Sequence, residues 1–235
     1  PDSVTRIGDY SFYDCNSLTS ITIPESVTSI EDSAFSGCRS LSSITIPAGV
    51  TSIGSYAFSG CSGLTSVTIL AGVTSIGNST FSNCSSLKSV TISNGVKSIG
   101  EFDFENCSSL TSVMIPESVT TICYHAFNSC RSLKHVYYGG SDLQWKKILI
   151  ESYNEPLTSA TIHYSATHIH NTEHTPGKAA TCTEAGNREY WHCLVCDVLF
   201  TDEDYTQSTD ANGIILPALG HTIRQVEATA PTCTQ

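Results

Sequence analysis

Basic residues are scarce in this sequence, which has 11 Lys and Arg against 22 Asp and Glu over 235 residues. The excess of acid is spread along the chain, with a net charge of about −5 on residues 1–164 and about −6 on residues 165–235. A protein that follows a phosphate backbone needs a basic patch or stripe, and the sequence contains none. We therefore expect no nucleic acid as a partner.

Long apolar runs are missing as well. No run approaches the ~20 residues needed to cross a bilayer, so we expect no membrane insertion in this fragment. No secretory signal peptide is visible either. Pro1 stands in phase with Pro24 and Pro47, which indicates that an N-terminal cap is absent and that the sequence is a fragment of a longer protein. The missing signal therefore says little about location.

Catalytic motifs are also absent. The sequence has no G-x-S-x-G elbow, no phosphate-binding glycine loop and no H-E-x-x-H pair. His125 and His135 lie about half a repeat apart, and no carboxylate is placed by periodicity beside both. We expect a protein that is not an enzyme.

What the sequence does contain is a 23-residue repeat in six copies. Five apolar columns recur at this period, and three of them begin at Val4, Ile7 and Leu18. The other two are Phe12, Phe35, Phe58, Phe81, Phe104 and Phe127, and Cys15, Cys38, Cys61, Cys84, Cys107 and Cys130. Such a period predicts a solenoid, in which each coil buries its apolar face against its neighbours. A solenoid offers an extended surface rather than a pocket, which favours binding over catalysis.

Each coil reads as one strand followed by turns. In the coil from Pro47 to Ile69, alternation at Val67, Thr68 and Ile69 predicts a strand with one buried face. Residues 55–61 are interpreted as one or two helical turns that bury Phe58. Stability is expected to come from stacked columns, with no coil stable alone.

The cysteine column stands beside the phenylalanine column, where small apolar residues are expected. Cysteine behaves as a small hydrophobe in protein cores. We therefore expect a buried ladder of free thiols, with a disulfide framework as the alternative. Cys123 lies outside the column, where four other coils carry glycine, and is expected to be more exposed.

The strand pattern L-x-x-[IV]-x-I is the leucine-rich repeat signature, and the string VTSIGxxAFxxCxxLTSVTIP resembles the BspA-like leucine-rich repeats of bacterial surface proteins. The resemblance covers residues 1–138, and all six copies match it. It implies a leucine-rich repeat solenoid with parallel strands and short helical turns. It also implies a secreted or surface-anchored protein that attaches to host or neighbouring-cell proteins.

Residues 139–164 depart from the repeat and are predicted to form a divergent C-terminal cap. Ser141 is a plausible N-cap for a helix over residues 141–150. Leu143, Ile148 and Trp145 or Leu149 would supply its buried side, with Trp145 packing as core. Residues 1–138 thus hold six repeats, and residues 165–235 form a separate region.

Outward strand positions are mostly Ser and Thr, but the last two repeats break this pattern. We predict ligand-binding residues there, where exposed side chains would form a recognition patch: Met114, Lys134, His135 and Tyr137. The alternative is that these side chains pack under the cap or the following domain. A second outward group precedes the phenylalanine column and is the next candidate: Tyr10, Ser33, Tyr56, Ser79, Phe102 and His125.

The region from 165 onward is interpreted as a small β-rich Cys/His module and the start of a second copy. It resembles the tandem GHT…TCTxxG…CxxC modules in surface proteins of anaerobic bacteria. Thiolates three residues apart suit one tetrahedral zinc ion, so we predict a structural zinc held by Cys182, Cys193, Cys196 and His221, with His174 as a second choice for the last ligand. A disulfide from Cys182 to Cys193 or Cys196 is the alternative, and redox chemistry of the pair is disfavoured.

Together these patterns predict a non-catalytic adhesion or binding protein, secreted or on the cell surface, that recognises a host or neighbouring-cell protein. A passive spacer with a zinc-stapled stalk is the first alternative. An ice-binding Ser/Thr ladder is a more distant one.

Overall fold

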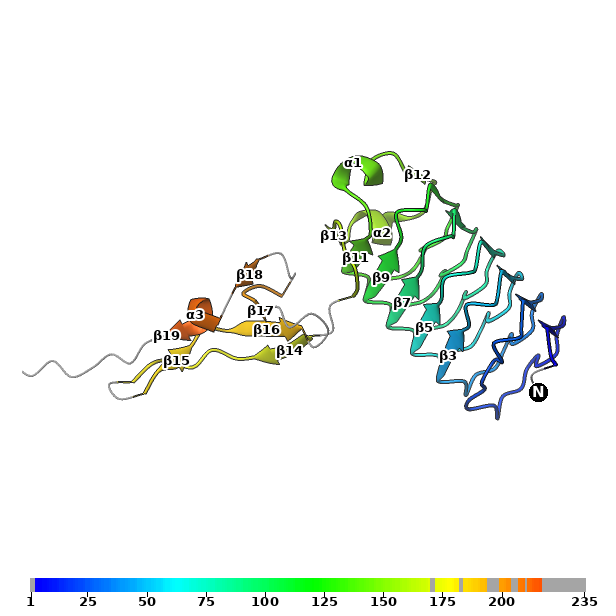
Figure 1. The fold of residues 1–235 in the computed structure, drawn as a ribbon, viewed down its shortest axis with the longest axis horizontal. Coiled ribbons are helices and arrows are strands. Elements are labelled where there is room, and N and C mark those ends of the chain that lie inside the picture. Colours follow the sequence, from blue (N-terminus) through cyan, green and yellow to red (C-terminus); the bar gives the residue numbers. More distant parts are fainter. Residues whose placement is uncertain are drawn as a thin grey trace, which may run out of the picture. The chain divides into compact units, whose positions relative to one another are not determined.

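The computed structural model describes residues 3–169, 172–181, 184–193, 199–203, 207–209 and 211–216. The chain divides into two compact units, Pro1–Ile169 and His170–Gln235. The first unit is a solenoid whose coils follow one another in sequence order (Figure 1). The solenoid predicted from the 23-residue period is confirmed.

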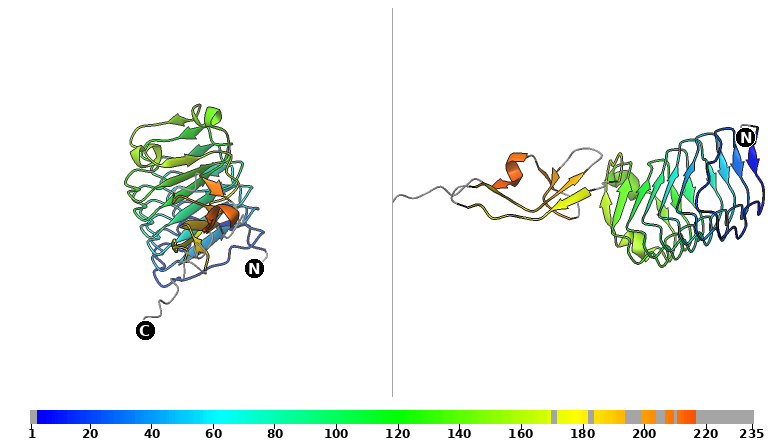
Figure 2. Two further views of the ribbon diagram at one scale, coloured as in Figure 1. Left: turned by 90° about the vertical axis from the view of Figure 1, so that its left-hand side faces the viewer. Right: turned by 90° about the horizontal axis from the view of Figure 1, so that it is seen from below.

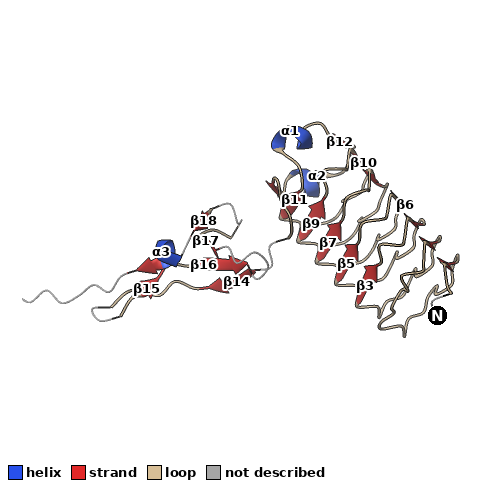
Figure 3. Cartoon of the chain, viewed as in Figure 1, coloured by secondary structure: helices blue, strands red, loops and turns tan. Residues whose placement is uncertain are grey.

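A six-stranded parallel sheet runs along one side of the solenoid (Figure 3). Each strand lies one coil after its neighbour, as in the pairing of Val67 with Val90. The strands are β3 (Ser43–Ile46), β5 (Ser66–Ile69), β7 (Ser89–Ile92), β9 (Ser112–Ile115), β11 (His135–Tyr138) and β13 (Thr161–His163). Alternation along each strand sends one row of side chains into the core and the other row outward.

A second set of short strands lies on another side of each coil, as Figure 2 shows in two further views. Four form one parallel sheet, β1 (Arg6–Ile7), β2 (Ser29–Ile30), β4 (Ser52–Ile53) and β6 (Ser75–Ile76). Three form another, β8 (Ser98–Ile99), β10 (Thr121–Ile122) and β12 (Leu149–Ile150).

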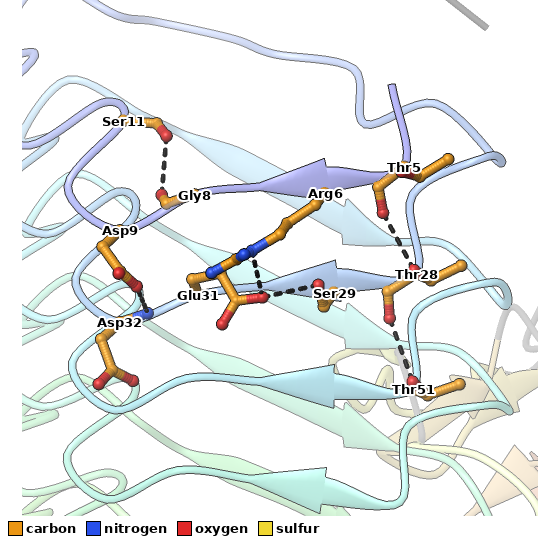
Figure 4. Close-up of polar contacts among 10 residues, drawn as sticks. All are labelled: Thr5, Arg6, Gly8, Asp9, Ser11, Thr28, Ser29, Glu31, Asp32 and Thr51. Carbon is orange, nitrogen blue, oxygen red and sulfur yellow. Dashed lines mark hydrogen bonds and ion pairs between the residues drawn. The ribbon is translucent and has the colours of Figure 1, made fainter. Parts of the chain in front are cut away.

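Hydroxyl groups beside these short strands connect successive coils. Thr28 Oγ1 donates to the carbonyl oxygen of Thr5 at 3.0 Å, and Thr51 Oγ1 donates to that of Thr28 at 3.1 Å (Figure 4). Asp9 accepts from the backbone N–H of Asp32 at 3.2 Å in the same way. These polar side chains therefore hold neighbouring coils together.

The segment after each short strand consists of tight turns, so the expected helical turns are wrong. In the third coil Tyr56 has φ +58°. This left-handed conformation cannot be part of a right-handed helix. Alternate amides instead point along the solenoid axis. Those of Tyr56, Phe58 and Gly60 donate to the next coil at 3.0, 2.8 and 2.8 Å. The amides between them close local turns, as Ser59 N–H does by donating to the carbonyl oxygen of Tyr56 at 3.0 Å, so the segment is held both by its neighbour and by its own turn hydrogen bonds.

The core consists of the predicted columns. The phenylalanine rings stack along the axis, with centroids 4.9–5.5 Å apart from Phe12 to Phe127. Five of the six column cysteines are buried free thiols. Each donates to the phenylalanine carbonyl of the preceding coil, as Cys61 Sγ does to Phe35 at 3.2 Å. Cys15 is an exposed free thiol.

The cap is built differently from its prediction. Helix α1 (Asp142–Trp145) has Ser141 as its N-cap, as expected, with a capping box to Gln144. The helix is only one turn long because Leu149 and Ile150 leave it to form β12. Trp145 and Ile148 pack against the core, whereas Leu143 is 71% exposed and is not part of the buried side. A second short helix, α2 (Glu155–Thr158), buries Leu157.

The second unit is β-rich. An antiparallel sheet contains β14 (Thr172–Thr175), β16 (Tyr190–Cys193), β17 (Leu199–Phe200) and β18 (Ser208–Thr209). Strands β15 (Gly186–Asn187) and β19 (Ile215–Leu216) form a second pair, and helix α3 (Ala211–Ile214) precedes β19. Among the described residues, no helix is long and apolar enough to span a bilayer.

Candidate binding surfaces

The outward side chains of the six-stranded sheet become less accessible from β3 to β11. Ser43 and Thr45 of β3 are exposed, whereas the outward residues of β7 are half-buried. In β9 and β11 all positions are buried. The open part of the sheet is therefore a surface of hydroxyl groups over β3, β5 and β7.

The predicted patch lies at the closed end of this gradient. Met114 is 9% exposed, His135 is 9% exposed and Tyr137 is 1% exposed. Tyr137 stacks on His163 with ring centroids 4.6 Å apart, and His135 Nδ1 lies 3.2 Å from His163 Nε2. The expectation that these three side chains are exposed is wrong.

The chain beyond the last strand supplies part of this cover. The backbone N–H of Ala166 donates to the carbonyl oxygen of Tyr138 at 3.0 Å, which holds the segment beside β11. Ala166 and Thr167 border a groove of about 470 Å³ that Met114 and Glu117 also line. Of the four residues predicted to bind a ligand, Lys134 alone is exposed.

A second surface is formed by the turns of each coil, which we call the turn segments: residues 8–14, 31–37, 54–60, 77–83, 100–106 and 123–129. These segments contain seven Asp and Glu and no Lys or Arg. The same segments carry large exposed aromatic side chains, among them Tyr10, Tyr56 and Tyr124. The surface is therefore both aromatic and acidic.

Two columns of the turn segments have a left-handed backbone. In one column the residues are those that tolerate positive φ: Asp14, Gly37, Gly60, Asn83, Asn106 and Ser129. The other column is the aromatic edge: Tyr10, Ser33, Tyr56, Ser79, Phe102 and His125, with φ between 55° and 59°. A bulky residue at positive φ is uncommon and strained. Local backbone energetics therefore do not explain the aromatic residues of this second column.

A group of four aromatic side chains lies at the C-terminal end of this edge. It consists of Phe102, Tyr124, His125 and Tyr153, which we call the aromatic cluster. Tyr124 and Tyr153 pack edge to face at 5.2 Å, and His125 lies 4.1 Å from Tyr124 and 4.4 Å from Tyr153 between centroids. Tyr124 is 38% exposed and Tyr153 is 51% exposed, so both rings face solvent.

Carboxylates surround the aromatic cluster. Glu105 Oε1 lies 3.5 Å from His125 Nδ1 and accepts from Asn128 Nδ2 at 3.1 Å. Glu151 Oε2 accepts from the backbone N–H of Tyr124 at 2.8 Å. Glu101 is exposed in the same turn segment as Phe102. The sequence alone did not point to Tyr124, Tyr153 or Glu105, because the cluster joins the last repeat to the divergent cap.

One carboxylate is buried in the core. Asp103 is 0% exposed and stands in the column where three other coils carry Ala34, Ala57 and Ala126. Burial raises the pKa of Asp103 to about 7, although hydrogen bonds from the N–H groups of Thr80 and Gly100 oppose the shift. The sequence analysis did not single out Asp103; the signal that could have found it is an acid in a column whose other members are Ala, Ser or Thr.

The predicted zinc ligands cannot be compared with the structure. Cys182, Cys196 and His221 lie outside the described residues, and only the backbone of Cys193 is described. In the described part of the chain no group of three or more His, Cys, Asp and Glu side chains could hold a metal ion. His174 Nε2 lies 2.7 Å from Glu189 Oε1 and its ring stacks on Trp191. The zinc site stays a prediction.

Comparison with known proteins agrees with the repeat architecture. Residues 5–134 and 63–172 match the family described as BspA type leucine rich repeat region (6 copies). No curated protein matches the sequence.

Solved structures of bacterial proteins are similar to the solenoid. A leucine-rich repeat protein from Bacteroides ovatus is 34% identical with a TM-score of 0.55, and the match covers 59% of this chain and 38% of that protein. A leucine-rich repeat protein of T. pallidum is 28% identical with a TM-score of 0.55, and the match covers 70% of this chain and 81% of that protein. The pneumococcal vaccine antigen PcpA is 21% identical with a TM-score of 0.54, over 71% of this chain and 39% of that one, and so shares the fold.

Proposed function

Because the chain belongs to the BspA-type leucine-rich repeat family, we propose that it is a non-catalytic binding module of a secreted or cell-surface bacterial protein. Its proposed ligand is a protein of a host or a neighbouring cell. Leucine-rich repeat proteins generally mediate protein–protein interactions, which supports this class of partner.

The observation that carries the proposal is the form of the accessible surface. The outward residues of β3, β5 and β7 are arranged in straight rows at the spacing of parallel strands. Stacked coils fix these rows in place, so little conformational entropy is lost when a partner binds. A rigid row of hydroxyl groups suits an extended protein surface better than a small substrate.

Met114, His135 and Tyr137 are buried, so they offer a partner protein little accessible surface. Lys134 remains accessible at the start of β11, and the open hydroxyl surface begins at β3. We therefore place the ligand on surfaces that are exposed in the coils, either the open sheet or the turn segments.

The experiment is a capture assay followed by binding with a purified partner. The full chain is immobilised and incubated with extracellular matrix and mucosal extracts, and each captured protein is then purified and titrated against the free chain. Saturable binding without chemical change in the partner is expected. Lack of saturable binding to any purified protein, or turnover of the bound protein, would contradict the proposal.

Blocking variants locate the contact. Thr45→Arg with Ser66→Arg places two cations on the open sheet, and Ser75→Arg with Ser98→Arg places two at exposed positions of the short strands β6 and β8. The second pair matches the first in charge and number. Loss of binding in the first variant alone assigns the sheet, and equal loss in both indicates a nonspecific charge effect.

A further inference from the structure

Resting on the proposed function, we propose that the aromatic cluster of Phe102, Tyr124, His125 and Tyr153, with its surrounding carboxylates, binds an arginine-bearing segment of the partner protein. The partner is thus identified by its chemistry, a guanidinium group presented on an extended chain. Exposed rings, the surrounding carboxylates and an unexplained backbone cost point to this partner.

The exposed rings provide π faces for a cation. Tyr124 and Tyr153 are both accessible and stand nearly perpendicular to each other, with an interplanar angle of 76°. A cation within ~6 Å of an aromatic centroid is attracted by the ring quadrupole, and arginine is the side chain most often found there. At an exposed site each such ring changes affinity by about two- to fivefold.

The negative charge around the cluster favours a cationic group on the partner. Glu101, Glu105 and Glu151 lie at or beside the cluster, and the turn segments contain no Lys or Arg that could pair with them. Guanidinium matches this setting because its planar fork donates to carboxylates while its face stacks on aromatic rings. Electrostatic complementarity would also speed the encounter and make it sensitive to salt.

The strained backbone of three cluster residues supports a role for them in binding rather than in folding. Phe102, His125 and Tyr153 all have positive φ, at 59°, 57° and 64°. The parallel left-handed column contains mainly Gly, Asn and Asp, which cost less in this conformation. Phe102 and His125 are half-buried, whereas Tyr153 is exposed. A strained ring that faces solvent, as that of Tyr153 does, is explained if a partner binds it.

The test uses the full chain and a synthetic peptide of alternating glycine and arginine. The matched control peptide replaces each arginine with citrulline, which keeps the planar shape and removes the charge. We expect the arginine peptide to bind at low salt and to weaken as salt rises, with the citrulline peptide at least tenfold weaker. Equal affinity for the two peptides would overturn the proposal.

Variants then locate the site. Tyr153→Ala is expected to weaken the arginine peptide about two- to fivefold, as estimated for one exposed ring, and Tyr124→Ala with Tyr153→Ala to weaken it further. Tyr56→Ala is the control because Tyr56 has the same 51% exposure as Tyr153 and lies in a distant coil. Circular dichroism checks that each variant is folded. Equal effects of Tyr153→Ala and Tyr56→Ala would place binding elsewhere.

Two further outcomes separate this inference from the proposed function. Saturable binding of a neutral glucan oligosaccharide that the arginine peptide does not displace would assign the rings to sugar and overturn the inference. A purified protein partner that binds Tyr124→Ala, Tyr153→Ala as tightly as the unchanged chain would also overturn it, while leaving the proposed function intact.

Discussion

Replacing Asp103 with alanine should remove a pH dependence from the stability of the solenoid. The carboxyl is fully buried, and burial raises its pKa to about 7 in the folded chain. In the unfolded chain the pKa of an aspartate is about 3.9. Between these two values the folded state holds a proton that the unfolded state has released.

The sign of the effect follows from this difference. Since the folded chain binds more protons, the free energy of unfolding falls as pH rises from about 4 to about 7 and is level above that range. A difference of about three pKa units corresponds to about 4 kcal/mol lost across the window. This is the penalty of burying the ionised carboxylate.

Alanine is the natural comparison because the structure accepts it at the same place in other coils. Asp103 accepts from the N–H groups of Thr80 and Gly100. In a neighbouring coil the equivalent amides of Ala57 and Gly77 donate to backbone carbonyls instead. Both amides therefore have acceptors available after the substitution. We expect Asp103→Ala to gain up to about 4 kcal/mol relative to the unchanged chain at pH 8 and little at pH 4.

The assay is urea unfolding followed by circular dichroism at a series of pH values from 4 to 8. Asp103→Asn keeps the volume without the charge and should lose the pH dependence too. Glu101→Gln, which removes an exposed carboxylate, should keep the slope of the unchanged chain. If Asp103→Ala and the unchanged chain show the same slope over this range, the reasoning about the buried carboxylate is wrong.

Three other predictions concern the architecture, the thiols and the metal. Deleting one whole coil, Pro47 to Ile69, should leave a folded and shorter protein, because each column loses one member. Deleting residues 47–58 should unfold the protein. Equal loss of circular dichroism in both variants would contradict a stacked solenoid. Among the column cysteines, Cys15 should react with a thiol reagent in the native chain and the five buried ones only after denaturation, and mass mapping that finds bridges between coils would refute the ladder. The full chain purified without chelator should carry about one zinc ion, as metal analysis would show. Cys193→Ser should lose the ion, with local unfolding of the second unit alone. Metal-free protein with a Cys182 disulfide would contradict this prediction.

The sequence predicted the solenoid well because its period determines which apolar side chains can be buried together. Columns such as that of Phe58 repeat at a fixed spacing, and only stacked coils bury them all. The turns were misread because residues 55–61 place apolar side chains at helical spacing. The decisive feature, the positive φ of Tyr56, leaves no sign in the type of residue found there.

The expected exposure of the patch was wrong for a different reason. Alternation along a strand correctly placed Met114 and Tyr137 on the outward row of the sheet. It does not show whether another part of the chain covers that row, and here the segment after β13 supplies part of the cover. The aromatic cluster was missed because Tyr153 comes from the cap, whose departure from the repeat hides which residues meet the last coil.

The hydrogen-bonded thiol ladder bears on how the column cysteines avoid oxidation. Burial raises the pKa of Cys61 and Cys130 to about 12, so that at pH 7 only about one thiol in 10⁵ is the reactive thiolate. In the unfolded chain the same thiols have an ordinary pKa near 8.5 and are exposed to oxidants. Folding thus protects these thiols, because a coil that stacks on its neighbour buries its own sulfur.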